Sequence, residues 1–112
     1  MSELLDSEML NELKEIMEDD FSSLLETFLV ESEKQYKAVQ AAWQNQNMDE
    51  LRRAAHTLKG SCGNIGAMPL RDICEGLEHD ARDAQTDRIP DLLANTEQQL
   101  SEVHQELKRR FA

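Results

Sequence analysis

The sequence predicts an all-α protein, an antiparallel up-down four-helix bundle with a short additional N-terminal helix. Apolar residues recur at helical spacing along nearly the whole chain, and the short alternating β-branched runs typical of strands do not occur. The chain has only two prolines, and each stands where a helix is expected to begin. At 112 residues it is long enough for one domain, predicted to span residues 1–112.

The first predicted helix covers about residues 6–17 and is too short to run the length of the bundle, so we expect it to cap one end. The second covers about residues 20–46 and carries a long apolar stripe. The stripe of this second helix comprises Phe21, Leu25, Phe28, Leu29, Ser32, Tyr36, Val39 and Trp43.

The other three helices have recognisable starts. Asn47 followed by Glu50 resembles a capping box, and this third helix is expected to end near Gly66. Pro69 suits the first turn of the fourth helix, and Pro90 marks the start of the fifth, which runs to Phe111. Because the connections are short, consecutive helices are predicted to be antiparallel.

The charge of the chain limits its partners. It has 23 acidic and 12 basic residues, a formal net charge of −11. This excess of acid argues against nucleic acid and anionic membranes and favours protein partners. No apolar run approaches the roughly 20 residues of a membrane span, and the first residues lack the features of a signal peptide, so a cytoplasmic location is expected. The apolar stripes are used up internally, which favours a monomer.

The two cysteines predict the register of the hairpin between the third and fourth helices. If its turn centres near residue 68, positions equally far from that point face one another, and Cys62 and Cys74 are such a pair. Both also lie in apolar registers, where a free cysteine behaves as a small hydrophobe. We therefore predict reduced, neighbouring thiols, because two cysteines are too few for a disulfide scaffold or a four-cysteine zinc site.

The most informative segment runs from Ala55 to Gly66. It contains three of the four glycines, although a glycine in a helix interior costs roughly 1 kcal/mol relative to alanine. On a helical wheel His56 points away from the apolar stripe, which predicts an exposed imidazole approached by another macromolecule. Its neighbours at turn spacing are Asp49, Arg52, Arg53, Lys59, Gly60 and Gly63. By contrast, His79 lies on an outer face without such neighbours, and His104 falls at the edge of a core stripe, as a packing residue would.

The run from Ala55 to Ala67 resembles the signature of the histidine-containing phosphotransfer (HPt) domain, His-x-Leu-Lys-Gly-Ser followed by a small residue and Gly-x-x-Gly. This sequence has His56-Thr57-Leu58-Lys59-Gly60-Ser61 and then Cys62, Gly63 and Gly66. The resemblance extends to chain length, helical organisation and the position of the histidine on the third helix. Cys62 is the notable variation, and it is predicted to face the core.

The resemblance implies that His56 is phosphorylated by a receiver-domain aspartate of a hybrid sensor kinase and passes the group to the receiver of a response regulator. Lys59 would attract the phosphoryl oxygens, and Gly60 and Gly63 would leave room for the partner. Mg²⁺ is expected on the receiver, with no cofactor or metal bound by this chain. A nucleotide-binding loop is missing from the sequence, so we expect a carrier without autokinase activity.

Further docking residues are predicted around His56. Arg52 and Arg53 could steer an acidic receiver pocket, and solvated surface charge is an equally good interpretation. Tyr36 and Lys37 on the second helix should lie level with His56 if the preceding turn centres near residue 46, and they are candidates for the docking rim together with Glu33.

Two other functions are alternatives to a phosphotransfer carrier. A non-phosphorylated helical adaptor could bind receivers or other regulators through the same surface. A metal-binding bundle would need inward-facing Glu-x-x-His pairs, and Glu75, Glu78 and His79 do not have that spacing.

Overall fold

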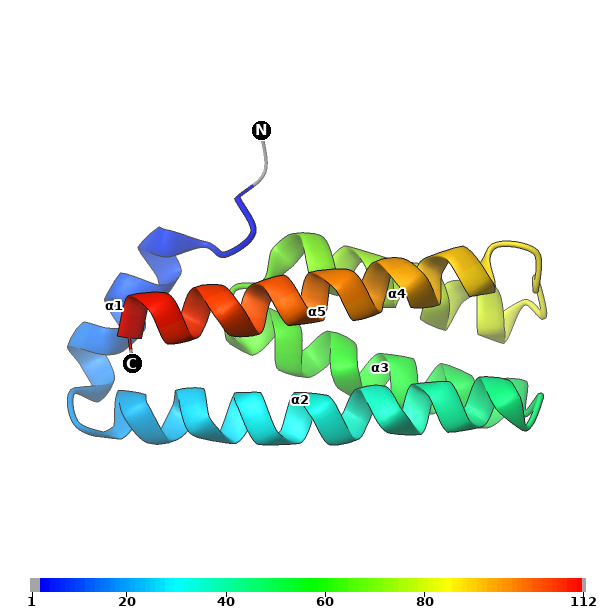
Figure 1. Cartoon of the computed structure of the whole chain (residues 1–112), viewed down its shortest axis with the longest axis horizontal. Helices are drawn as coiled ribbons and strands as arrows, with labels where there is room; N and C mark the ends of the chain where they lie inside the picture. The colour runs from blue at the N-terminus through cyan, green and yellow to red at the C-terminus, as the bar shows by residue number, and fades with distance from the viewer. Residues whose placement is uncertain (1–2, 112) are drawn as a thin grey trace.

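The computed structural model describes residues 3–111, so positions 1, 2 and 112 of the predicted domain lie outside it. Helices and connecting loops, without a strand, make up these residues. The helices are α1 (Ser7–Met17), α2 (Asp20–Gln44), α3 (Met48–Asn64), α4 (Met68–Arg82) and α5 (Ile89–Phe111). Helices α2 to α5 form an up-down bundle, and α1 lies at one end of it (Figure 1). The predicted all-α fold is therefore confirmed.

Local chemistry explains where the helices begin and end. The side chain of Asn47 accepts a hydrogen bond from the backbone N–H of Glu50 at 3.1 Å, as expected of an N-cap. Pro69 stands in the first turn of α4. Helix α2 ends at Gln44, two residues before the predicted bound, because Gln46 adopts a left-handed φ of 53° that no helix can continue through.

Each long helix packs against two neighbours. Helix α3 lies between α2 and α4, and α5 closes the ring against α4 and α2. In Figure 1, α2 and α5 lie on the near face, with α3 and α4 behind them. The apolar stripes meet at the centre, where each fully buried leucine contributes about 1.5–3 kcal/mol by leaving water. Fully buried core leucines include Leu51, Leu58, Leu70, Leu77 and Leu107. Among the described helices, none is long and apolar enough to cross a membrane.

Helix α1 seals one end of the bundle, as predicted. Leu5 and Leu10 are fully buried there. The backbone N–H of Asp6 donates to the carbonyl of Gly66 at 2.8 Å, which ties the N-terminal segment to the turn between α3 and α4. Gly66 has a φ of +78°, and a Cβ at this position would lie 3.2 Å from that of Asp6. Only glycine suits this turn, because it meets both requirements.

The two cysteines meet in the interface between α3 and α4. Cys62 and Cys74 are both buried and free. A hydrogen bond with the Cys74 thiol, together with burial, raises the pKa of Cys62 far above its usual value. The contact agrees with the predicted register of this hairpin.

Candidate functional site

His56 lies near the middle of α3 and faces solvent, with 64% of its side chain exposed. One turn later, a Cβ added to Gly60 would meet nothing within 4 Å. A Cβ on Gly63 would meet only the flexible side chain of Arg71, at 3.5 Å. The surface beside the imidazole therefore has free space at Gly60 and only one flexible side chain near Gly63.

A carboxylate from the neighbouring helix holds both His56 and Lys59. The Nδ1 atom of His56 lies 2.9 Å from Oε2 of Glu78 on α4, and Nζ of Lys59 lies 2.7 Å from Oε1 of the same carboxylate. The side chains of Lys59 and Glu78 are only 17% and 21% exposed, whereas the imidazole projects outward. The three side chains form one connected group, which we call the His56 cluster.

The electrostatics of the His56 cluster fix the role of each atom. Burial disfavours the charge on Glu78, but the contacts with Lys59 and His56 outweigh it and hold the pKa of this carboxyl below its usual value. An ionised carboxylate only accepts hydrogen bonds, so Nδ1 of His56 must donate. A neutral imidazole that carries its hydrogen on Nδ1 keeps a lone pair on Nε2. The exposed ring of His56 thus has its Nδ1 occupied by the Glu78 carboxylate.

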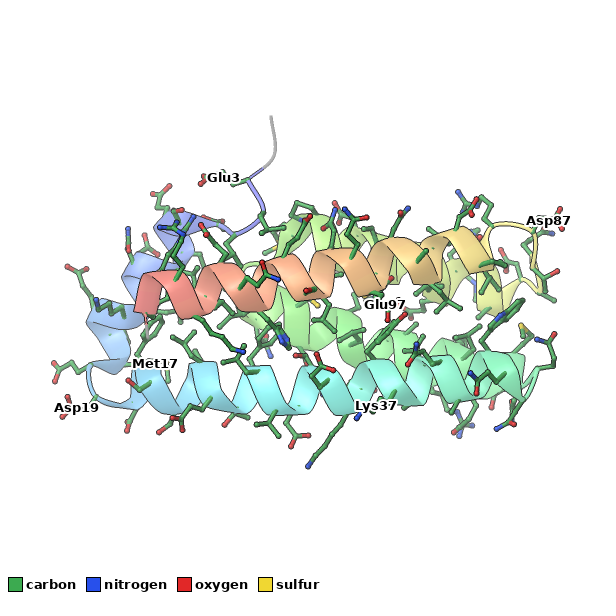
Figure 2. The ribbon with its side chains drawn as sticks, viewed as in Figure 1. Glu3, Met17, Asp19, Lys37, Asp87 and Glu97 are labelled. Atoms are coloured by element: carbon green, nitrogen blue, oxygen red, sulfur yellow. The ribbon has the colours of Figure 1, made fainter. Side chains whose placement is uncertain are left out.

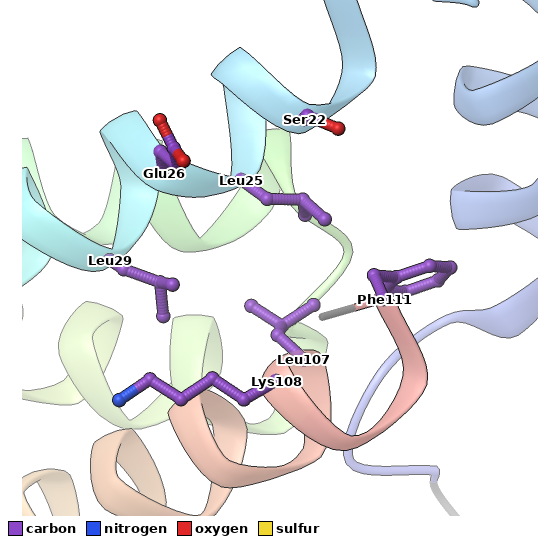
Figure 3. A pocket seen from close by; sticks show the side chains of 7 residues that line it. All are labelled: Ser22, Leu25, Glu26, Leu29, Leu107, Lys108 and Phe111. Atoms are coloured by element: carbon purple, nitrogen blue, oxygen red, sulfur yellow. The ribbon is translucent and has the colours of Figure 1, made fainter. Parts of the chain in front are cut away.

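A pocket elsewhere in the molecule has no imidazole in its lining. It has a volume of about 240 Å³ and lies between α2 and the end of α5 (Figure 3). Its lining is largely aliphatic and aromatic and includes neither histidine nor cysteine: Ser22, Leu25, Glu26, Leu29, Leu107, Lys108 and Phe111. The His56 cluster lies on α3 and α4 instead.

Comparison with known proteins settles the family. The sequence model described as Hpt domain matches residues 23–109. The chain belongs to the Hpt family. The crystal structure of histidine-containing phosphotransfer protein B (HptB) from Pseudomonas aeruginosa PAO1 is similar, with 34% sequence identity and a TM-score of 0.94, over 98% of this chain and 96% of that one. A search of curated proteins gave no significant match.

Hpt domains are histidine phosphotransfer intermediates of phosphorelay signalling, and their partners are receiver domains of kinases and response regulators. This Hpt protein is accordingly a phosphotransfer carrier. The resemblance found in the sequence is confirmed, and so is the function that it implied, that of a histidine phosphotransfer protein in phosphorelay signalling.

Two arginines of this Hpt domain lie on the same helix as His56 and share one acidic partner. Arg52 and Arg53 each lie 3.1 Å from a carboxylate oxygen of Asp49, one turn earlier on α3. Asp49 therefore offsets part of their charge. Such exposed pairs contribute little to stability, which leaves both side chains free to reorient toward a partner.

Tyr36 and Lys37, predicted for the docking rim, border a groove between α2 and α5, whereas the contact of His56 is with α4. Tyr36 is buried, and its hydroxyl donates to the carbonyl of Leu93 on α5 at 3.1 Å. Lys37 is exposed and, with Glu33, borders a groove between α2 and α5. Figure 2 shows Lys37 projecting from α2, on the face where α2 and α5 lie nearest the viewer.

Sequence reasoning missed the contacts of Glu78 with His56 and Lys59 and considered this residue only as a metal ligand. The register that pairs Cys62 with Cys74 also places position 78 between His56 and Lys59 on the opposite helix. That register was the signal that could have found it. Within residues 3–111 no group of three or more histidine, cysteine and acidic residues could hold a metal ion.

The other histidines of the Hpt domain lie in different settings. His104 is 8% exposed, and its Nε2 lies 2.8 Å from Oγ of Ser32 on α2. Its ring meets that of Phe28 edge-on, with centroids 5.7 Å apart. The predicted packing role is confirmed. His79 is exposed on α4 and lies between two carboxylates, those of Asp80 and Asp83.

Proposed function

We propose that His56 carries the phosphoryl group, taking it from the receiver aspartate of a hybrid sensor kinase and giving it to the receiver of a response regulator. The observation that carries this proposal is the exposed imidazole, whose Nδ1 is engaged by Glu78 while Nε2 is left to a partner. Lys59 supplies positive charge within the same cluster.

The transfer needs little from the carrier beyond position and charge. The Nε2 lone pair attacks the phosphorus of the aspartyl phosphate, the N–P bond forms and the aspartate leaves. Phosphoryl transfer depends mainly on in-line positioning and charge neutralisation. Lys59 can attract the phosphoryl oxygens, and Mg²⁺ is expected on the receiver rather than on this chain. The sequence has no nucleotide-binding loop with which to phosphorylate itself from ATP.

The surroundings of His56 suit the approach of a receiver. Gly60 and Gly63 would let the partner backbone come close to the imidazole, and Arg52 and Arg53 would attract its acidic pocket. We expect the carrier to act as a monomer, because its apolar stripes are buried within the bundle. The two buried free thiols are consistent with a reducing, cytoplasmic setting.

A labelling experiment tests the assignment of His56. The wild type, a His56→Gln variant and a His79→Gln control are each mixed with a receiver that carries labelled phosphate. We expect acid-labile, base-stable label on the wild type and the control and none on His56→Gln. Thermal melting should be nearly unchanged, because exposed polar substitutions usually alter stability by less than about 0.5 kcal/mol.

Full labelling of His56→Gln would refute the assignment. A wild type that binds the receiver without ever acquiring label would instead indicate the adaptor function.

A further inference from the structure

We propose that Asp49 competes with a receiver for Arg52 and Arg53, and that this competition keeps each complex of the carrier with a receiver short-lived. The inference rests on the proposed function, because it concerns the partner that meets His56. It adds an acidic residue of this chain to the docking surface, as the group that the partner must displace.

One carboxylate holds both arginines in the unbound protein. Oδ1 of Asp49 lies 3.1 Å from Nη2 of Arg52, and Oδ2 lies 3.1 Å from Nη2 of Arg53. Each oxygen therefore serves a different guanidinium. The exposed fractions are 62% for the side chain of Asp49, 36% for Arg52 and 64% for Arg53. An incoming molecule can thus reach all three side chains.

These residues lie on the face of α3 that carries His56. With about 3.6 residues per turn, Asp49 falls within about 20° of His56 on the helical wheel, two turns earlier. Arg52 and Arg53 stand one turn before the histidine, at positions that neighbour it on the helix surface. A partner seated over the imidazole therefore meets the carboxylate and both arginines.

The charge balance of this face explains why a receiver would use the arginines. The whole chain has a net charge of −11, and the charge of Lys59 is matched by Glu78. Two arginines against one carboxylate leave an excess of positive charge beside the histidine. A receiver that holds Mg²⁺ supplies carboxylates, because this ion prefers oxygen ligands. The carboxylates of the receiver and of Asp49 are therefore rivals for the same two guanidinium groups.

Competition of this kind weakens binding without abolishing it. Exposed ion pairs contribute little free energy, so the carboxylates of a partner can replace Asp49 at small cost. Asp49 is joined to the arginines by less than two turns of helix, and this tether gives it a high effective concentration. It therefore recaptures a guanidinium as soon as a partner contact loosens. A carrier that exchanges a donor for an acceptor needs such rapid release.

The test compares the wild type with Asp49→Asn, with the double variant Arg52→Gln/Arg53→Gln and with the triple combination. Glu50→Gln is the matched control, because Glu50 is exposed, stands in the same first turn of α3 and carries the same charge. On the wheel, however, it lies about 120° from His56. The probe is an isolated receiver domain with Mg²⁺ and without phosphate. Its dissociation constant and dissociation rate are measured by biolayer interferometry at about 0.1 M ionic strength.

We expect Asp49→Asn to bind the receiver about two- to fivefold more tightly, the range that exposed ion pairs allow, and mainly through slower dissociation. Glu50→Gln should stay close to the wild type. In the background that lacks both arginines, Asp49→Asn should have no more effect than Glu50→Gln, because no guanidinium is left to compete for.

Equal binding by Asp49→Asn and Glu50→Gln would overturn the inference, and so would a gain from Asp49→Asn that persists without the arginines. Neither result bears on whether His56 accepts phosphate. A wild type that binds the receiver without acquiring label contradicts the proposed function instead, and the binding comparison still decides the inference. The two failures are therefore distinguishable.

Discussion

At the scale of single residues, the three histidines differ in what their ring nitrogens contact. In His104, Nε2 is taken by a buried hydroxyl. In His79, Nδ1 and Nε2 each lie 3.3 Å from a carboxylate. In His56 only Nδ1 is engaged, and the ring is exposed. Among the described residues, His56 thus combines solvent access with a ring nitrogen, Nε2, for which no contact is found.

The cysteines give a residue-scale prediction about reactivity. Only a thiolate attacks disulfide reagents rapidly, and the hydrogen bond with Cys74 together with burial raises the pKa of the Cys62 thiol. We expect native protein at pH 8 to react at most slowly with an aromatic disulfide reagent. Two thiols per chain should react at once after unfolding in urea, as followed by absorbance. Rapid stoichiometric reaction of the native protein would show that this interface opens readily.

At the scale of the helix, α3 sacrifices stability for an open surface at Gly60. Because an added Cβ there meets nothing within 4 Å, Gly60→Ala should raise the free energy of unfolding by up to about 1 kcal/mol. Gly60→Gln should also fold but project into the space that a receiver needs, so its transfer rate should fall. Urea unfolding and single-turnover transfer measure the two effects separately.

Gly66→Ala provides the contrast on the same segment. It should destabilise the protein, because Gly66 has a φ of +78° and its Cβ would crowd Asp6. Unfolding of Gly60→Gln would make Gly60 a packing residue. A folded Gly60→Gln with the normal transfer rate would show that the partner does not approach over this face.

Sequence periodicity predicted the helices well, because each stripe depends only on local spacing. The capping residue Asn47 and Pro69 placed two helix starts correctly. Helix α2 ends two residues before its predicted bound because Gln46 has a left-handed backbone conformation. A glutamine side chain does not indicate such a conformation. The helices were thus predictable from residues whose effect is confined to the helix that contains them.

Contacts between helices were predicted less completely. The exposure expected of His56 and the pairing of Cys62 with Cys74 agree with the structure, because both follow from one wheel or one hairpin register. Tyr36 was predicted both on the core stripe and on the docking rim, and its burial agrees with the core stripe; the side of α2 that faces α5 is set by the whole ring of helices. Glu78 was overlooked because its contacts with His56 and Lys59 become visible only when α3 and α4 are considered together.

At the scale of the whole molecule, His104 links the first and last long helices of the bundle. Its contact with Ser32 joins positions 72 residues apart in sequence. Burial lowers the pKa of His104, with an opposing effect of Glu33 and a further lowering by Lys108. The unfolded chain therefore binds a proton at this position before the folded one does.

Stability should consequently fall as the pH drops below about 6.5, the ordinary value of histidine, toward the lower folded value. Above that range the contribution of His104 is constant. Urea unfolding of the wild type at pH 7.5 and pH 5.5 should show a larger loss on acidification than a His104→Gln variant does. Equal losses in the two proteins would rule out His104 as the group responsible.

Under the proposed function, the position of His56 on one side of the bundle also governs the order of events. If His56 carries the phosphoryl group, its one exposed ring on α3 meets one receiver at a time, so the donor must depart before the acceptor can arrive. Such a carrier follows ping-pong kinetics. An acceptor present in large excess would occupy the unloaded carrier and obstruct its own supply. The ratio of donor to acceptor in the cell, and not the affinity of either alone, would then set how quickly a signal passes.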